Sequence, residues 1–192
     1  IAVQDPAHYG QPLIKTPWVM SDAISSWDWP EALGKPIVVE VYAPGDEAEL
    51  FLGGTSLGKK PLENFRALFE LTYAPGTLKA MAYKDGICLD ETVLSSPDAA
   101  SLRLAVDTVG DELIYLNAVL ADDKGVVITS ADEELTAEIT GAKLLGFGSA
   151  DPKPSFNYNE GKTKTWNGRA QLILQKEGTD PAQVTLRSSS GK

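Results

Sequence analysis

Hydrophobic and polar residues alternate along much of the chain between residues 36 and 94. Alternation with a period of two places one set of side chains on one face of an extended strand. The apolar positions of this kind are Ile37, Val39, Val41, Phe65, Ala67, Phe69, Leu71 and Tyr73. Turn residues separate the runs, at Pro44-Gly45, Gly53-Gly54, Pro75-Gly76 and Asp85-Gly86. Because Gly and Pro permit or preset turn dihedrals, the pattern predicts an antiparallel sandwich.

A second series of alternating segments follows residue 97. Its apolar positions are Leu102, Leu104, Val106, Leu135, Ala137, Ile139, Leu172, Leu174, Val184 and Leu186, with a longer apolar strand at 113–120. Residues 122–125 predict a hairpin turn, and the polar segment 149–165, with its prolines, asparagines and Gly161, predicts a long loop. Residues 132–135 are the best helical candidate, but the β-branched residues that follow favour a strand.

The predicted fold class is therefore all-β, with two immunoglobulin-like antiparallel β-sandwich domains in tandem. Residues 1–25 contain three prolines and no steady period, which predicts an irregular leader, ordered only by packing of Ile14 and Trp18 on a neighbour. The first sandwich is expected at 26–96 and the second at 97–192, divided by a small, polar segment at 95–100. The expected core side chains are Phe51, Phe69, Leu71 and Ala80 in the first and Leu104, Leu116, Ile139 and Leu172 in the second.

Composition narrows the function classes. The 192 residues carry a formal charge of −10, which disfavours nucleic acid and anionic membrane surfaces as partners. The apolar runs are far shorter than the roughly 20 residues of a spanning helix. Cys88 is the only cysteine, so no internal disulfide forms, and a strand position among apolar neighbours predicts that it is buried. The chain begins at Ile1 without a methionine or signal peptide, which favours a processed or excised segment.

Several phrases carry a resemblance to a known family. They are ELFL at 49–52, SLG at 56–58, FELTYAPG at 69–76 and LKAMAYKDG at 78–86. Their order resembles that of an accessory domain of the family 2 glycoside hydrolases, the β-galactosidase group. The family's Asn-Gly turn is Gly53-Gly54 here, which still supports a hairpin. A further phrase of the same domain is SWDW at 26–29. The phrases GFGSADP at 146–152 and NGRA at 167–170 resemble those of the next domain of the same enzymes.

The resemblance covers most of residues 26–190 and includes no catalytic barrel. It implies a non-catalytic C-terminal accessory or scaffold fragment of a β-galactosidase-like enzyme, whose partner is the catalytic barrel of the parent protein. A secreted, periplasmic or cell-surface parent fits this resemblance, whereas the sequence leaves the compartment unknown. Two alternatives stay open, namely an independent carbohydrate-binding module and a bacterial surface spacer or adhesion repeat.

Candidate chemistry is sparse. Glycoside hydrolysis needs two positioned carboxylates, but the many acidic residues cluster at turns, where solvated charge is expected. His8 lies in the leader, and one His with one Cys cannot make a zinc site. Asp107, Asp111, Asp122 and Asp123 lack a calcium-loop pattern, and Gly146-Phe147-Gly148 lacks the rest of a phosphate-binding motif. We therefore predict no catalytic residue, no cofactor and no metal.

The aromatic residues are the better candidates for binding. Trp27 and Trp29 would share a face of an extended strand and are expected to anchor the leader against the first sandwich or a neighbouring domain. Trp166 and Tyr158 lie in or beside the long loop of the second domain. Their rings could stack on the C–H face of a sugar while Asn157 and Asn159 exchange hydrogen bonds with its hydroxyls.

Overall fold

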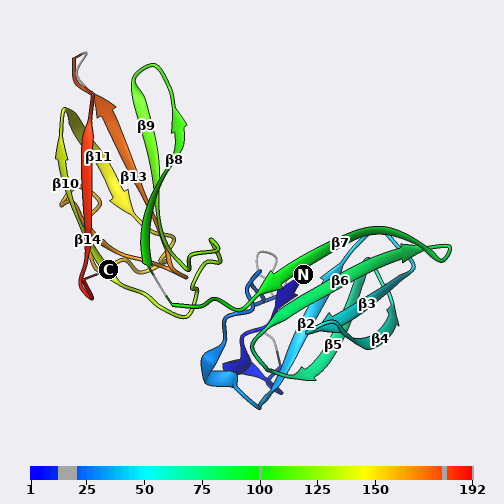
Figure 1. The fold of residues 1–192 in the computed structure, drawn as a ribbon. Coiled ribbons are helices and arrows are strands. Elements are labelled where there is room, and N and C mark those ends of the chain that lie inside the picture. The colour runs from blue at the N-terminus through cyan, green and yellow to red at the C-terminus, as the bar shows by residue number, and fades with distance from the viewer. Residues whose placement is uncertain (13–20, 100, 179–180, 192) are drawn as a thin grey trace. The chain divides into compact units, whose positions relative to one another are not determined.

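The computed structural model describes residues 1–12, 21–99, 101–178 and 181–191. The chain is all-β and divides into two compact units, residues 1–96 and 97–192. Each unit is a sandwich of one three-stranded and one four-stranded antiparallel sheet (Figure 1). Ile14 and Trp18, which the sequence offered as anchors of the leader, lie outside the described residues.

The described residues of the first unit form seven strands and two short 3-10 helices. The strands are β1 (Ala2–Val3), β2 (Pro36–Tyr42), β3 (Glu47–Leu52), β4 (Thr55–Pro61), β5 (Arg66–Thr72), β6 (Thr77–Lys84) and β7 (Ile87–Ser95), and the helices are η1 (Pro6–His8) and η2 (Pro30–Ala32). One sheet has the order β1-β2-β5 and the other β4-β3-β6-β7. The leader is thus partly regular, because β1 pairs with β2 through Ala2–Glu40 and Val3–Val39.

The core of the first unit follows the predicted alternation with one register error. Phe69 and Ala80 are buried, and Leu71 packs at the edge of the core. Phe51 was expected inside but lies on the opposite face of β3, where the Nζ of Lys79 stands 5.1 Å from its ring centroid. Leu50, fully buried, takes its place in the core. A slip of one residue exchanges the two faces of a strand, which accounts for the error.

Three two-residue hairpin turns in the first unit have positive φ at both central residues. Gly53-Gly54 has φ values of 56° and 83°, so the hairpin predicted there is confirmed. Asn64-Phe65 has φ values of 51° and 66°, and it leaves the Phe65 ring 68% exposed, contrary to its predicted place in the apolar stripe. Cys88 is also exposed rather than buried, because it lies on the edge strand β7.

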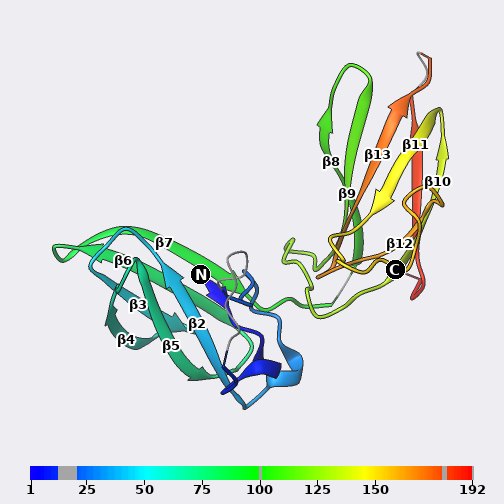
Figure 2. The same cartoon turned by 180° about the vertical axis from the view of Figure 1, so that it is seen from behind.

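Within the part of the second unit that the structure describes, another seven strands occur: β8 (Ser101–Val109), β9 (Leu113–Ala121), β10 (Glu134–Thr140), β11 (Ala142–Gly148), β12 (Lys162–Lys164), β13 (Arg169–Lys176) and β14 (Gln183–Ser188). Its sheets have the orders β12-β10-β14 and β11-β13-β9-β8. Figure 2 labels β12, which lies inside the segment expected to be a loop and pairs with β10. The candidate helix at 132–135 does not form, since 132 and 133 are irregular and Glu134 begins strand β10.

The core of the second unit also departs from expectation at one position. Leu116 and Leu172 are buried, and Ile139 packs against the core. Leu104 is 39% exposed although it pairs with the buried Ala118 and faces the same way. Its strand, β8, is the edge of a four-stranded sheet that faces a sheet of three strands. No strand of the described chain therefore covers this edge.

Candidate functional site

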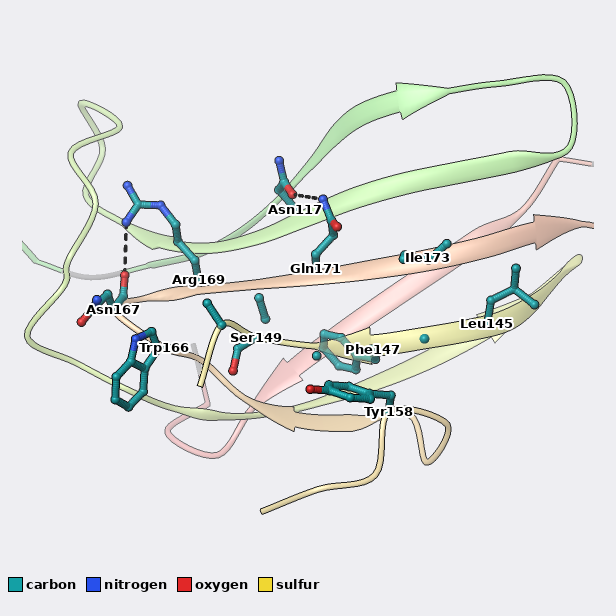
Figure 3. A pocket seen from close by; sticks show the side chains of 14 residues that line it. Asn117, Leu145, Phe147, Ser149, Tyr158, Trp166, Asn167, Arg169, Gln171 and Ile173 are labelled. Carbon is teal, nitrogen blue, oxygen red and sulfur yellow. Dashed lines mark hydrogen bonds between the residues drawn. The ribbon is translucent and has the colours of Figure 1, made fainter. Parts of the chain in front are cut away.

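The second unit has a groove on the outer face of its four-stranded sheet, with a cavity volume of about 770 Å³. Strands β9, β11 and β13 supply its floor, and the segments around Tyr158 and Trp166 supply its walls (Figure 3). Inward residues of these strands, such as Leu116 and Leu172, fill the core. The alternate residues therefore point outward and form the floor of the groove.

Two glycines of β11 shape this floor. Gly146 has nothing within 4 Å of the position that a Cβ would take, so it leaves open space. At Gly148 a Cβ would lie 2.4 Å from both Cδ1 and Cε1 of Tyr158. The tyrosine ring therefore lies directly on the backbone of Gly148, and the Tyr158 carbonyl accepts a hydrogen bond from the Phe147 N–H at 2.8 Å. These glycines seat an aromatic platform, which is a different role from phosphate binding.

A tight hairpin turn brings Trp166 and Arg169 together. The central residues Asn167 and Gly168 have φ values of 49° and 70°, the positive pair of a type I′ turn. Trp166 and Arg169 exchange both backbone hydrogen bonds, at 2.9 and 3.1 Å. Residues paired directly across two antiparallel strands project their side chains from the same face. The indole ring and the guanidinium therefore line the same groove.

Amide side chains occupy the middle of the floor. Gln171 of β13 pairs with Asn117 of β9 and with Gly148 of β11. The Gln171 Nε2 donates to the Asn117 Oδ1 at 3.1 Å (Figure 3). Each amide keeps further donors and acceptors that a bound hydroxyl group could use. The groove thus combines two aromatic surfaces with a row of hydrogen-bonding groups.

Of the four sugar-contact residues predicted from sequence, the structure brings two to this groove. Trp166, 39% exposed, and Tyr158, 48% exposed, both line it. Asn157 and Asn159 flank Tyr158 as exposed residues and are not among the lining residues. Sequence reasoning missed Arg169, Gln171 and Asn117. The Asn-Gly pair at 167–168 was the available signal, since it predicts a two-residue hairpin that places Arg169 opposite Trp166.

Trp27 and Trp29 have different surroundings within the first unit. Trp27 is buried against Tyr73, with ring centroids 4.8 Å apart, and its Nε1 donates to the Ala74 carbonyl at 3.1 Å. Trp29 is partly buried and packs against the same core. Residues 26–29 do not form a strand. Any role of the pair in packing between domains stays a prediction.

Three carboxyl groups of the described residues, Glu40, Glu49 and Asp122, have lowered pKa values. Burial acts to raise the pKa of Glu40, but hydrogen bonds from Tyr42, Gln4 and Ser21 and the charge of Arg66 outweigh it. A general acid in glycoside hydrolysis needs the opposite displacement.

Asp122 is a structural residue of a turn. Backbone N–H groups of Asp98, Val126 and Lys124 donate to its carboxylate at 3.0, 2.8 and 2.9 Å, and they lower its pKa. Across the described ranges, no three His, Cys, Asp or Glu side chains gather as a metal site would require. The same residues include no helix long and apolar enough to cross a membrane.

Known protein families match both units of the chain. The family described as "Glycoside hydrolase family 2 C-terminal domain 5" matches residues 100–192, almost the whole second unit. The chain carries a C-terminal domain of the family 2 glycoside hydrolases. A family described only as a domain of unknown function, DUF4982, matches residues 34–89 of the first unit.

Family 2 enzymes and a related β-glycosidase are similar to this chain over most of its length. A family 2 glycosyl hydrolase from Bacteroides cellulosilyticus DSM 14838 superimposes with a TM-score of 0.85 at 30% identity over 98% of the chain. A β-glycosidase from Bacteroides vulgatus has a TM-score of 0.74 at 26% identity over 86% of the chain. The β-galactosidase BoGH2A of Bacteroides ovatus is 25% identical over 158 residues, or 78% of the chain. The chain spans only 27%, 23% and 18% of these proteins, respectively.

Proposed function

We propose that this chain is the non-catalytic accessory part of a β-galactosidase-like family 2 glycoside hydrolase and supports the catalytic barrel of that enzyme. The observation that carries the proposal is the small share of each related enzyme that this chain spans. Both units match family 2 enzymes in sequence order, yet the chain spans at most 27% of the relatives described above. The bulk of such an enzyme, including a catalytic domain, is therefore expected outside this chain.

Two features of the surface and the titratable groups support this proposal. Apolar side chains stand exposed along the edge strand β8, at Leu104, Val106 and Val109. Exposed apolar patches of this kind mark surfaces that pack against another domain. The lowered pKa values of Glu40, Glu49 and Asp122 are also the reverse of what the general acid of a glycoside hydrolase would need.

The test of the accessory role has two parts. The isolated chain, incubated with aryl-galactosides and other aryl-glycosides, should release product only at the background rate. The parent enzyme, expressed with and without this chain, should unfold at a lower temperature when the chain is missing. Turnover by the isolated chain that disappears when one of its acidic residues is replaced would contradict the proposal. An unchanged melting temperature of the shortened enzyme would contradict the proposal that this chain supports the catalytic barrel.

A second function is favoured by the groove of the second unit. Carbohydrate contact needs aromatic faces beside hydrogen-bonding groups, and Trp166, Tyr158 and Gln171 supply both within one cavity. We therefore propose that the second unit also lends a sugar contact to the enzyme. Titration with galactose oligomers should shift the amide signals of 145–150 and 166–171. Shifts confined to Trp27 and Trp29 would instead place the contact in the first unit.

A further inference from the structure

The groove of the second unit carries a positive charge and no negative one. Arg169 is the only ionised side chain among its lining residues. The ion pairs found in the described ranges involve other cations, so no described carboxylate neutralises this guanidinium at ion-pair distance. The Arg169 Nη1 donates to the Asn167 carbonyl at 3.3 Å, which leaves further N–H donors. The charge of the groove is thus opposite in sign to the formal charge of the chain, which is −10.

Two carboxylates beside residues of the groove accept hydrogen bonds from the backbone. Asp132 accepts a hydrogen bond from the Gly168 N–H at 3.5 Å, on the turn that carries Trp166 and Arg169. Asp151 accepts one from the Lys153 N–H at 2.8 Å and so holds the segment that leaves β11. Neither residue lines the groove. An incoming anion would therefore meet the guanidinium without displacing a carboxylate from it.

The remaining lining groups suit a sugar ring better than a peptide. Trp166 and Tyr158 offer flat surfaces at two places on the wall, and Gly146 leaves open floor between the strands. The middle of the floor is polar, with the paired amides of Gln171 and Asn117. A docking peptide strand would need a free strand edge, but on the edge strand β11 the Phe147 N–H already donates to the Tyr158 carbonyl. A sugar presents both C–H faces and hydroxyl groups, which match the aromatic and amide groups of the groove.

We propose that this groove binds an acidic glycan. The sugar ring stacks on Trp166 or Tyr158, its hydroxyl groups bond to Gln171 and Asn117, and its carboxylate or sulfate group pairs with Arg169. The guanidinium fork matches the oxygen atoms of such an anion in geometry as well as in charge. The inference rests on the proposed sugar contact and adds its chemical class, which neither family match assigns to this domain.

The test uses the whole chain and three sets of oligosaccharides of equal length. These are oligomers of galacturonic acid, sulfated galactose oligomers and neutral galactose oligomers, each titrated at low and at high salt while amide shifts and heats are recorded. The acidic oligomers should bind at least about tenfold more tightly than the neutral ones at low salt, a difference of about 1.4 kcal/mol. Because screening weakens exposed charge pairs, this preference should shrink at high salt.

Variants separate the charge from the aromatic platform. Arg169→Gln should abolish the preference for acidic oligomers and leave the weak affinity for neutral ones unchanged. Trp166→Ala should weaken binding of every oligomer. Lys143→Gln, which removes the same charge from an exposed β11 residue outside the groove, should leave all affinities as they are. Amide spectra verify that each variant folds.

The outcomes distinguish the proposed sugar contact from the proposed preference for acidic glycans. Equal affinity for acidic and neutral oligomers, or a preference that survives Arg169→Gln, would overturn the acidic class and leave the sugar contact standing. Absence of any shift with all three sets would overturn both the acidic class and the sugar contact, while the accessory role would stand on its own tests. If only one acidic set binds, that result identifies carboxylate or sulfate as the group that Arg169 recognises.

Discussion

At the scale of single residues, the Asn64-Phe65 turn is the clearest departure from backbone preference. A bulky residue at a φ of 66° is unusual because its Cβ approaches the following carbonyl oxygen. The ring is mostly exposed and recovers little of this cost by burial. The neighbouring hairpins use Gly53-Gly54 and Asp85-Gly86, with glycine at the equivalent second position.

Replacement Phe65→Gly should therefore stabilise the chain. It gives the turn the Asn-Gly pair that type I′ hairpins prefer, as at 167–168. The left-handed penalty of about 1–2 kcal/mol is removed, and loss of the small buried part of the ring reduces the net gain to about 1 kcal/mol. Chemical denaturation measures the change, with Asn64→Gly as a control of smaller effect, since Asn tolerates this region. A destabilised Phe65→Gly variant would mean that the ring contributes to packing.

Gly148 is a residue whose missing side chain determines where a neighbouring ring, that of Tyr158, lies. Its φ is not in the left-handed region, so alanine fits the backbone, but the added methyl meets the Tyr158 ring. Gly148→Ala should displace the ring and cost about 1–3 kcal/mol, as overpacking does. Gly146→Ala on the same strand meets open space and should cost much less. Equal effects of the two variants on unfolding and on the Tyr158 signals would contradict this account of the platform.

At the scale of elements, a buried carboxylate ties the leader to the first sheet. Glu40 of β2 is fully buried, and its Oε1 accepts hydrogen bonds from Gln4 Nε2 at 2.6 Å and Ser21 Oγ at 2.7 Å. Its Oε2 accepts from the Tyr42 hydroxyl and lies 3.8 Å from Arg66. A leader that looked irregular in sequence is thus held by a residue that interrupts the apolar pattern of β2.

The Glu40 carboxylate should contribute a pH-dependent part of the stability. Its pKa in the folded chain is lowered, below an unfolded value of about 4.3. The stabilisation is therefore complete above that unfolded value and is lost as the pH falls through the folded pKa. Glu40→Gln should cost about 1–3 kcal/mol at neutral pH, because an amide donor would then face the donors of Gln4, Ser21 or Tyr42.

The measurement is urea unfolding of the wild type and Glu40→Gln as a function of pH. The difference in unfolding free energy between them should shrink in acid below about pH 4.3. Glu63→Gln, at an exposed turn position, should change little at any pH. A difference between wild type and Glu40→Gln that stays constant into strong acid would show that the carboxylate charge plays no part.

At the scale of the whole molecule, the two units have separate cores. One cluster runs from Val3 to Ala80, and the other lies between Leu116 and Leu174. A domain with its own core can fold by itself. We therefore expect each unit to unfold as its own cooperative transition.

Core truncations should act on one unit at a time. Phe69→Ala should cost the first unit about 3–5 kcal/mol, and Leu172→Ala should cost the second about 2–5 kcal/mol. Amide hydrogen exchange reports the two units separately. Each variant should speed exchange in its own unit and leave the other unchanged. Faster exchange in both units after one substitution would show that the units stabilise each other.

The sequence by itself determined the fold class, the family and two members of the candidate site. Period-two alternation and Gly-containing turns depend on local sterics, which act wherever the residues occur. Phe69, Leu116 and Leu172 therefore lie inside as expected, and Trp166 and Tyr158 lie in the groove as exposed aromatic residues.

Only the tertiary structure decided what covers each strand and which side chains meet. Leu104 alternates correctly but belongs to an edge strand that the facing sheet does not reach. Phe51 faces outward because the opposite face of β3, in its pairing with β6, packs against the core. Asn117, Gln171 and Gly148 become one site through pairing of strands distant in sequence. Such long-range pairings are set by the packing of the whole unit, so a local pattern carries no record of them.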